Sequence, residues 1–401
     1  MRVILAGATG VRKDHLINKI LGEVLKQKNL PLDPDNVNSR KYIRYFNLEK
    51  ELEQKYKAPL WSFLTNLNER EQHDRWSGTF ESIMTEIDRE NPRHVLLSMH
   101  MTFFQSSRFF TLIDQTKLKL FRPDLFVTLV DDTYAVWQRI VSKSESQEDP
   151  GQNYLRLRDI MSWRTVEILV ADLVATQLSN KNFILAVKHP VKTLFDLIFN
   201  PQKTLVYASF PISVTREDPI VQKEINSFRQ HLHENYIALD PLTIDEKIIQ
   251  FILREANKKG GADPSLYYLR KESRWAFPKG HSLVDDEDLP FPVKLKKDEI
   301  EEVDRDIEDN VRSRDIRLVS DVDALVGYRP YFGKHVHEGI KTEIDFATLI
   351  SKPRFLYFPE DDVEEDPSAF KAKGVEYRKL DDLYSALAKF RPKEIRSWGG
   401  V

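Results

Sequence analysis

Glu343 is the residue whose type and surroundings most directly suggest chemistry. The pattern predicts a helix that begins near Gly339, and because residues three and four apart share a helix face, Glu343 lies in line with Gly339 and Ala347. The helix dipole favours the ionised form of an acid one turn into a helix. A partly desolvated carboxylate of this kind can act as a nucleophile at an acetal-like carbon. The alternative interpretation is an ordinary surface acid.

A glycine loop near the amino terminus is a second candidate site. Gly7 and Gly10 stand between a predicted strand and a predicted helix, where the amides of a helix N-terminus converge on an anion. Lys13 has the position of a phosphate-loop lysine, and Arg12 adds a second cation. Arg12 also replaces the usual second glycine, and Asp14 replaces the hydroxyl residue that would hold magnesium. The loop predicts a phosphate site or, as the alternative, a tight strand-to-helix turn.

The elements that must position these residues alternate between strands and helices. Unbroken apolar runs, which are typical of strands buried on both faces of a parallel sheet, occur at 2–6, 94–99, 124–130 and 182–187. A second series of such runs occurs at 204–209, 236–240, 322–327 and 353–358. Apolar residues at helical spacing lie between these runs. The sequence therefore predicts an α/β protein of two three-layer domains with mainly parallel sheets.

The domain boundary follows from the place where the second series begins. The first predicted domain covers residues 1–198, and the second covers residues 203–392. Glycine, proline and scattered aromatic residues at about 256–297 predict a long insertion in the second domain. The highly charged segment at 298–317 is predicted to be a solvated helix lying over the sheet.

The first domain resembles the P-loop nucleoside and nucleotide kinases, most of all the archaeal-type adenylate kinases. The resemblance rests on the glycine loop and on motifs that follow it in order, HVLLSMH at 94–100, FRPDLFVTLVDD at 121–132 and VKHP at 187–190. It implies a kinase-like fold that binds ATP or another nucleotide through the loop residues Gly7, Gly10, Arg12 and Lys13. It also implies a lid of arginines over the polyphosphate, namely Arg139, Arg156, Arg158 and Arg164.

Two departures from this family concern magnesium. The family's second strand ends in Asp-x-His, whereas this chain has Ser98, Met99 and His100 there. Asp14 adds the second departure, because it stands where a hydroxyl would bind the metal. Without these ligands the Mg²⁺ binding on which phosphoryl transfer depends is compromised, so nucleotide binding is expected rather than kinase activity. For the lid arginines the alternative is a set of solvated surface charges.

The second domain resembles the nucleoside 2-deoxyribosyltransferase superfamily, which includes nucleotide N-hydrolases with a flavodoxin-like sheet. The matching segments are DALV at 323–326, HEGIKTE at 337–343 and SKP at 351–353, with LVYASFPIS upstream at 205–213. The resemblance implies that Glu343 is the catalytic nucleophile and Gly339 the glycine that a ligand approaches closely. It also implies that Asp323 orients the site or shares its charge, the alternative being a helix cap or a loop acid.

The same resemblance supplies the residues expected around the sugar. Tyr207, Ser209 and Pro211 belong to the segment that matches the family's first strand and substrate loop, and Tyr207 is expected among the catalytic residues. Relatives in this superfamily commonly complete their sites between subunits, which implies a homo-oligomer.

The main departure from the superfamily is His337, which stands where a serine is usual. Together with His335, Lys341 and Arg329, His337 would form a more cationic anion site. Arg314 and Asp315 match a charged pair that the family often shows before the strand at 322–327, and a surface ion pair is at least as good an interpretation.

The composition limits the other classes of function. The chain has 401 residues, with 60 Lys and Arg against 63 Asp and Glu, a net charge of −3 and no Cys. This balance excludes a polybasic nucleic-acid arm, thiolate nucleophiles and Cys-ligated zinc, and no other metal site is expected. Because no apolar stretch reaches the ~18 residues of a membrane span, a cytoplasmic protein without membrane or nucleic-acid partners is expected.

The leading hypothesis joins a degenerate kinase-like, nucleotide-binding domain to a domain that cleaves or transfers the N-glycosidic bond of a nucleoside or nucleotide. The glycosidic chemistry requires no cofactor, and ATP or another nucleotide is the expected ligand of the first domain. Two alternatives stay open. One is an ATP-dependent nucleoside or nucleotide kinase with a nonstandard metal arrangement, and the other is a non-catalytic nucleotide sensor.

Overall fold

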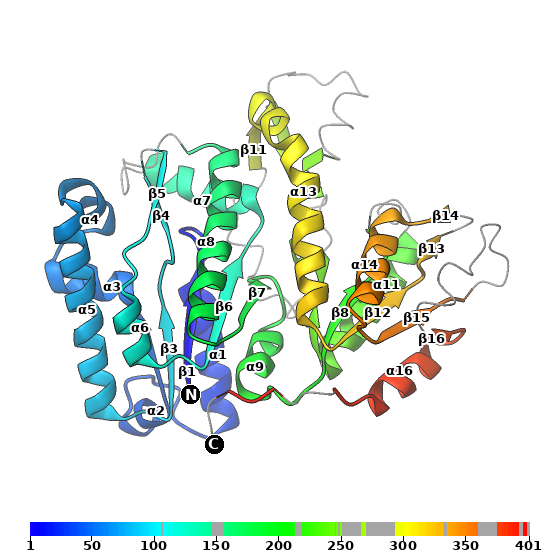
Figure 1. Cartoon of the computed structure of the whole chain (residues 1–401), viewed down its shortest axis with the longest axis horizontal. Helices are drawn as coiled ribbons and strands as arrows, with labels where there is room; N and C mark the ends of the chain where they lie inside the picture. The colour runs from blue at the N-terminus through cyan, green and yellow to red at the C-terminus, as the bar shows by residue number, and fades with distance from the viewer. Residues whose placement is uncertain are drawn as a thin grey trace.

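The computed structural model describes residues 1–105, 107–145, 155–212, 219–244, 246–247, 249–250, 266–269, 293–332, 335–359, 375–392 and 396–398. Two α/β units lie side by side, and each contains a five-stranded parallel sheet with helices on both faces (Figure 1). The predicted fold class, two three-layer α/β units with mainly parallel sheets, is confirmed. Within the described ranges, no helix combines the length and apolar character needed to cross a membrane.

The first sheet has the glycine loop at the end of its central strand. Its strands, in spatial order, are β2 (Ile43–Asn47), β3 (His94–Ser98), β1 (Arg2–Ala6), β6 (Leu125–Val130) and β7 (Asn182–Ala186). Every residue of β6 and of β7 is buried, as the unbroken apolar runs predicted. The edge strand β2 was not predicted, because polar residues such as Arg44 and Asn47 interrupt its apolar pattern and the strand is only partly buried.

Helices cover both faces of the first sheet. They are α1 (Lys13–Gln27), α2 (Val37–Tyr42), α3 (Leu48–Tyr56), α4 (Leu60–Asn66), α5 (Glu69–Glu90), α6 (Gln115–Phe121), α7 (Thr133–Glu145), α8 (Leu157–Gln177) and α9 (Val191–Phe199), and β4 (Phe103–Gln105) pairs with β5 (Arg108–Phe110) in a hairpin. The apolar stripe of α1 packs with α7 and α9 on one face, whereas α3 and α5 pack on the other. The two faces therefore have separate cores.

The second sheet has the strand order of flavodoxin-like folds. From one edge to the other its strands are β9 (Ile237–Leu239), β8 (Leu205–Ser209), β12 (Ala324–Tyr328), β15 (Arg354–Tyr357) and β16 (Val375–Tyr377). Numbered along the chain this order is 2-1-3-4-5, which places the reversal of strand order between β8 and β12. The edge strand β16 was not predicted, because a strand of 3 residues leaves too short a pattern.

The helices of the second unit are α11 (Pro219–Asn235), α13 (Lys297–Asp321), α14 (Glu338–Leu349), α16 (Leu380–Lys389) and the short 3-10 helix η2 (Pro241–Thr243). Two small hairpins pair β10 (Leu266–Leu269) with β11 (Val293–Lys296) and β13 (Tyr331–Phe332) with β14 (His335–Val336). Most of the insertion expected at 256–297 lies outside the described residues.

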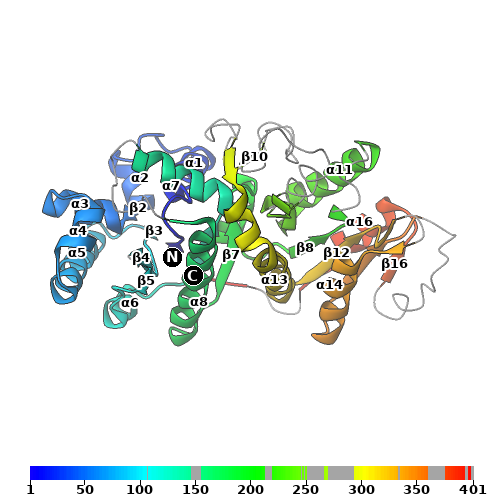
Figure 2. The same ribbon diagram turned by 90° about the horizontal axis from the view of Figure 1, so that it is seen from above.

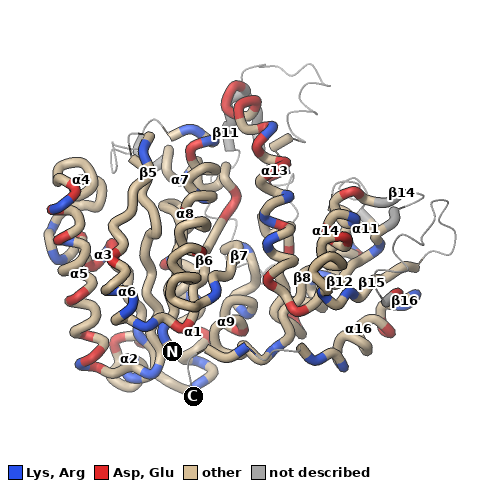
Figure 3. Tube along the Cα trace, in the orientation of Figure 1, with Lys and Arg blue, Asp and Glu red and all other residues tan. Residues whose placement is uncertain are grey.

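Helix α13 differs from its sequence prediction. Charges of both signs alternate along it (Figure 3), which led to the expectation of a solvated helix over the sheet. Instead α13 stands between the two units (Figures 1 and 2), and its residues Ile300, Val303 and Ile307 are completely buried. Arg317 pairs with Asp172 of α8 at 2.9 Å. The charged residues of α13 thus form contacts between the units while its apolar residues enter a core.

The contact between the two units is continuous and partly polar. One hydrophobic cluster includes residues of β7 and α9 from the first unit and of β9 and α13 from the second. Within this contact, Nε2 of the buried His189 accepts a hydrogen bond of 3.1 Å from the amide of Asp240. The segment 396–398, red in Figure 1, runs back beneath the first unit, where Trp398 Nε1 donates to the carbonyl of Leu197 at 2.7 Å.

Candidate active site

A cavity of about 540 Å³ lies beside the carboxyl end of β8. Its described walls come from the loop after β8, from η2, from the middle of α13 and from the start of α14. Ligands of open parallel sheets bind outside the carboxyl ends of the strands, at the point where the strand order reverses. The cavity takes that place in the second sheet, and its volume suits a small organic ligand.

Glu343 is held at the wall of this cavity by two hydroxyl groups. The Tyr207 hydroxyl donates to Oε1 over 2.8 Å, and the Ser209 hydroxyl donates to Oε2 over 2.5 Å. Tyr207 and Ser209 are two residues apart on β8, so both side chains point to the same face of the sheet. Glu343, Tyr207 and Ser209 therefore lie together, as expected. Glu343 is buried, with 9% of the residue exposed.

The ionisation of Glu343 differs from the sequence expectation. Burial, followed by the nearby charge of Asp315, raises the pKa of Glu343 to about 8. The hydrogen bonds from Ser209 and Tyr207 act in the opposite direction but do not outweigh burial. Glu343 lies beyond the first turn of α14, which begins at Glu338, and the helix dipole falls off within that turn. At neutral pH the buried carboxyl group is thus mainly protonated in the free site.

Asp315 adds a second buried carboxyl group to the cavity wall. It lies on α13, is 9% exposed, and accepts Nη2 of Arg314 at 2.8 Å. Arg314 also donates to the carbonyl of Ile244 at 3.0 Å. Burial raises the pKa of Asp315 even though Arg314 opposes the shift. A surface ion pair was the alternative prediction for Arg314 and Asp315, and the apolar residues Ile316 and Leu318 that follow them in the sequence were the signal of burial.

His337, Gly339 and Pro211 also line the cavity, as expected for residues that contact a ligand. His337 precedes α14 directly, and its Nε2 is buried without a hydrogen-bond partner among the described residues. Burial lowers the pKa of His337, which favours the neutral ring. A Cβ atom added at Gly339 would meet nothing within 4 Å, so this position is open toward the cavity.

Three residues predicted for this site lie elsewhere. Asp323 is at the opposite, amino end of β12, where Oδ2 accepts the amide of Leu205 at 2.8 Å and Oδ1 pairs with Arg396 at 2.5 Å. Arg329 pairs with Glu224 at 3.2 Å, and Lys341 is exposed on α14; neither is among the described residues that line the cavity. The sequence segments match the expected order, but strand direction separates Asp323 from Glu343.

Glu246 connects the cavity wall to the first unit. It is 1% exposed, and its two carboxylate oxygens accept Nη1 and Nη2 of Arg164 at 2.5 and 3.0 Å. Thr133, at the start of α7, donates its amide to the same carboxylate at 3.3 Å. Arg164 was expected to close over a polyphosphate, but it serves as the partner of an acid from the second unit. Arg164 outweighs the effect of burial and lowers the pKa of Glu246.

Two more of the four predicted lid arginines, Arg156 and Arg158, also face the second unit, whereas Arg139 contacts the glycine loop. Arg156 pairs with Glu302 of α13 at 3.3 Å, and Arg158 pairs with Glu302 at 3.7 Å and with Asp306 at 3.4 Å. These side chains are more than half exposed. They contribute to the contact between the units rather than to the glycine loop.

The glycine loop is closed by bonds within the first unit. The Gly7 amide donates to Oε1 of the buried Glu167 at 3.0 Å, and Arg139 Nη1 donates to the Gly10 carbonyl at 2.6 Å. Gly7 has a φ of +149°, and a Cβ there would lie 2.7 Å from the carbonyl oxygen of Leu129. A glycine is therefore required for the turn itself, which is the alternative that the sequence left open.

Lys13 and Asp14 form hydrogen bonds with other residues of the first unit. The Lys13 ammonium group is buried and donates to the Gly7 carbonyl, and burial lowers its pKa. Asp14 accepts the Asn47 side chain at 2.7 Å and the Tyr45 hydroxyl. A cavity of only about 10 Å³ is found against the described residues on the α8 side of the loop. Arg12 precedes α1 in the left-handed conformation with a φ of 64°.

Comparisons with known proteins give weak structural likenesses only. No protein-family model matches the chain, and no curated protein matches it. Among solved structures, a shikimate kinase from Bacteroides thetaiotaomicron is 12% identical, with 46% of this chain and 85% of that chain covered and a TM-score of 0.28. A shikimate kinase from Acinetobacter baumannii in complex with shikimate is 11% identical, covering 50% and 93%, with a TM-score of 0.30.

A third solved structure spans both units. The UDP-GlcNAc 2-epimerase from Methanocaldococcus jannaschii is 12% identical, with 100% of this chain and 95% of that chain covered and a TM-score of 0.22. At these scores the likenesses carry no argument about function. Within the described ranges, no group of three or more His, Cys, Asp or Glu is placed to hold a metal ion.

Proposed function

We propose that the second unit cleaves the N-glycosidic bond of a nucleoside or nucleotide and that Glu343 is the nucleophile. The observation that carries this proposal is the buried carboxyl group of Glu343, bonded to Tyr207 and Ser209 at the wall of a cavity of about 540 Å³. A second buried acid, Asp315, lines the same cavity. Acid-assisted displacement at a sugar carbon uses two carboxyl groups, one protonated and one ionised, and two carboxyl groups line this cavity.

The first step forms a covalent intermediate. An oxygen of ionised Glu343 bonds to C1′ of the sugar while the bond from C1′ to the base nitrogen breaks. The electron pair of that bond goes to the base, which takes a proton from Asp315. The base leaves, and the sugar stays as an ester of Glu343.

The second step returns the site to its starting state. Water attacks C1′ of the ester and gives a proton to Asp315. The bond between C1′ and Glu343 breaks, and its electron pair returns to the carboxylate. If the nitrogen of a second base attacks instead of water, the same step transfers the sugar.

One shared proton explains how Glu343 can react although its pKa is raised. The charge of Asp315 raises the pKa of Glu343, so the protonation of one carboxyl group depends on that of the other, and we propose that one proton occupies either group. The hydroxyl groups of Tyr207 and Ser209 stabilise the charge on Glu343 when the proton is on Asp315. Both pKa values are raised, which keeps this reactive microstate within reach.

The start of α14 is the proposed contact for the polar part of the substrate. His337 lines the cavity, its buried Nε2 has no hydrogen-bond partner among the described residues, and Gly339 leaves open space beside it. A sugar hydroxyl or a phosphate oxygen could accept a hydrogen bond there, because amides at a helix N-terminus favour anions. Arg329 and Lys341 have no part in this contact.

The proposal is tested by release of free base. The protein is incubated with a panel of nucleosides, nucleotides and dinucleotides, and free base is separated by chromatography. Glu343→Gln is expected to lower the rate by at least about 10³-fold, because removal of a nucleophile abolishes the covalent route. Asp345→Asn, which changes a carboxyl group of the same helix outside the cavity lining, is the matched control. Equal release by the Glu343→Gln variant would eliminate the proposed role.

Phosphoryl transfer by the first unit has no supporting observation. Lys13, which would have to reach a phosphate, donates to the Gly7 carbonyl instead. Tight nucleotide binding by the second unit without any base release would favour the non-catalytic sensor.

A further inference from the structure

A second large cavity, of about 640 Å³, lies at the amino-terminal edge of the first sheet. It is bounded by the carboxyl ends of α1, α2 and α9, by the start of β3 and by the segment 396–398. No described residue lines both this cavity and the one that contains Glu343. It also lies at the opposite edge of the first sheet from the glycine loop, which follows β1. This cavity therefore belongs to neither of the two predicted sites.

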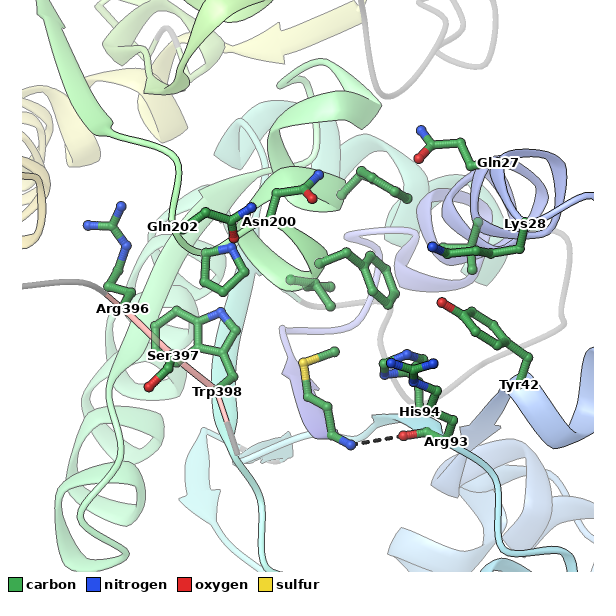
Figure 4. Close-up of a pocket in the computed structure, with 16 residues that line it drawn as sticks. Gln27, Lys28, Tyr42, Arg93, His94, Asn200, Gln202, Arg396, Ser397 and Trp398 are labelled. Atoms are coloured by element: carbon green, nitrogen blue, oxygen red, sulfur yellow. Dashed lines mark hydrogen bonds between the residues drawn. The ribbon is translucent and has the colours of Figure 1, made fainter. Parts of the chain in front are cut away.

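The charged residues of this cavity are all cations. Lys28 and Arg93 lie on one side and Arg396 on the other (Figure 4), and none of the described lining residues is Asp or Glu. Within the described part of the chain, neither Lys28 nor Arg93 pairs with a carboxylate. Arg396 pairs with Asp323, but its Nε is buried without a partner among the described residues. The cavity therefore offers donors and positive charge to an anion.

Aromatic rings form much of the remaining wall. The His94 ring meets Tyr42 and Phe199 edge-on, at centroid distances of 5.1 and 5.3 Å. Trp398 faces them across the cavity (Figure 4) and is fixed by its bond to the carbonyl of Leu197 at 2.7 Å. The Nδ1 atom of His94 is buried and has no hydrogen-bond partner among the described residues. Rings on opposite walls leave room for a flat group between them.

The electrostatics at His94 agree with an anion site. Burial, followed by the positive charges of the amino terminus, Arg93 and Lys28, lowers the pKa of His94 to about 4. The ring is therefore neutral at pH 7 and adds no positive charge to the cavity. An alternative role for Lys28 is to complement the helix dipole at the end of α1. That role predicts an effect on stability and none on ligand binding.

We propose that this cavity binds an aromatic anion of the size of a nucleoside monophosphate. Lys28 and Arg93 contact the phosphate, because charge-assisted hydrogen bonds from cationic side chains are the strong ones. The base lies between the wall of Tyr42 and His94 and the wall of Trp398. This site is additional to the proposed glycosidic cleavage and does not depend on it.

The test measures binding of adenosine 5′-monophosphate by isothermal titration calorimetry. The full chain carries Glu343→Gln, so that slow turnover does not disturb the titration. Lys28→Ala and Arg93→Ala are each expected to weaken binding by at least about tenfold, through loss of a hydrogen bond to a charged group. Lys26→Ala removes an exposed cation of α1 that does not line the cavity, and it serves as the charge-matched control with unchanged affinity.

Two further ligands test the two parts of the proposed molecule. Adenosine and inorganic phosphate are each expected to bind at least tenfold more weakly than the monophosphate. The proposal is overturned if the monophosphate does not bind, or if its affinity is insensitive to Lys28→Ala and Arg93→Ala. Equal affinity for inorganic phosphate would overturn the aromatic part, and equal affinity for adenosine would overturn the anionic part. A loss of base release in the Glu343→Gln variant leaves this result untouched, because the two cavities are separate.

Discussion

Arg164 of the first unit holds both carboxylate oxygens of Glu246 of the second unit, at 2.5 and 3.0 Å. Glu246 lines the cavity that contains Glu343, and it is 1% exposed. An arginine that the sequence assigned to a phosphate lid therefore supports the wall of the other unit's cavity. The ion pair joins the two units at the place where the proposed chemistry occurs.

Removal of Arg164 is expected to destabilise the protein strongly. Arg164→Ala leaves a buried carboxylate without its partner, which costs about 3–5 kcal/mol. Chemical denaturation monitored by circular dichroism measures the change in free energy of unfolding. Arg158→Ala removes an exposed ion pair with Glu302 and Asp306 and is expected to cost less than about 1 kcal/mol. Similar losses of stability in the two variants would mean that the buried ion pair of Arg164 with Glu246 stabilises the protein no more than the exposed pairs of Arg158.

The raised pKa of Glu343 predicts a pH-dependent stability. Its pKa is 4.5 in ordinary surroundings and about 8 in the folded protein, so the folded state binds more protons between these values. The free energy of unfolding therefore falls as the pH rises from about 4.5 to about 8. Glu343→Gln removes this dependence, whereas Asp345→Asn is expected to retain it. Denaturation curves at several pH values check the slope; parallel curves for the wild type and Glu343→Gln would contradict it.

Asp315→Asn is expected to affect cleavage according to the leaving group. Loss of the proton donor slows release of an ordinary base by about 10²–10⁴-fold, which is the usual contribution of general acid catalysis. A nucleoside analogue with a leaving group that needs no proton is expected to be affected far less. Parallel rate measurements with both substrates separate the two cases. A uniform loss would mean that Asp315 only supports the structure of the cavity.

Gly339→Ala is expected to weaken substrate binding without loss of stability. The added methyl group meets no atom within 4 Å but occupies space that lines the cavity. Alanine is also favoured over glycine in a helix by up to about 1 kcal/mol. The matched control is Gly22→Ala in α1, where a Cβ likewise meets nothing within 4 Å. KM is expected to rise only in the Gly339 variant, and a rise in both or in neither would contradict the proposed approach of the ligand.

Lys13 is expected to contribute to stability and not to nucleotide binding. Its ammonium group donates to the Gly7 carbonyl, and a hydrogen bond to a charged group is worth about 1.5–3 kcal/mol. Lys13→Ala should therefore lower the midpoint of thermal unfolding. Because Lys13 lines neither proposed ligand cavity, ATP with magnesium should shift the midpoint of the wild type and that of Lys13→Ala by the same amount. Stabilisation of the wild type by ATP that Lys13→Ala abolishes would instead support the phosphate site inferred from the sequence.

Local sequence patterns predicted the parts of the fold that depend on local properties. The apolar runs at β1 and β6 mark strands covered on both faces, and the periodic apolar residues of α1 mark its buried stripe. The edge strands β2 and β16 were not predicted, because a strand at the edge of a sheet tolerates polar residues and can be short. The charged pattern of α13 was misleading, because its charges find partners on another unit instead of in water.

In the candidate site, too, the sequence predicted single residues, whereas tertiary packing decided which of them lie together. Glu343 could be selected from its place in the predicted helix and from the superfamily that the segment resembles. Its contact with Tyr207 joins residues that are 136 positions apart, and only the pairing of strands and the packing of α14 bring them together. The resemblance also implied that Asp323 orients the site, but the two ends of a strand lie at opposite edges of the sheet, and Asp323 is at the end away from Glu343.

The sequence by itself determined the class of fold and the two series of strands, because these depend on neighbouring residues and on helix or strand periodicity, and it singled out Glu343 as a candidate. Only the tertiary structure decided the protonation of Glu343, the partners of Lys13 and Arg164, and the burial of Asp315. Desolvation and charge pairing arise from groups that are distant along the chain, so local patterns do not contain them.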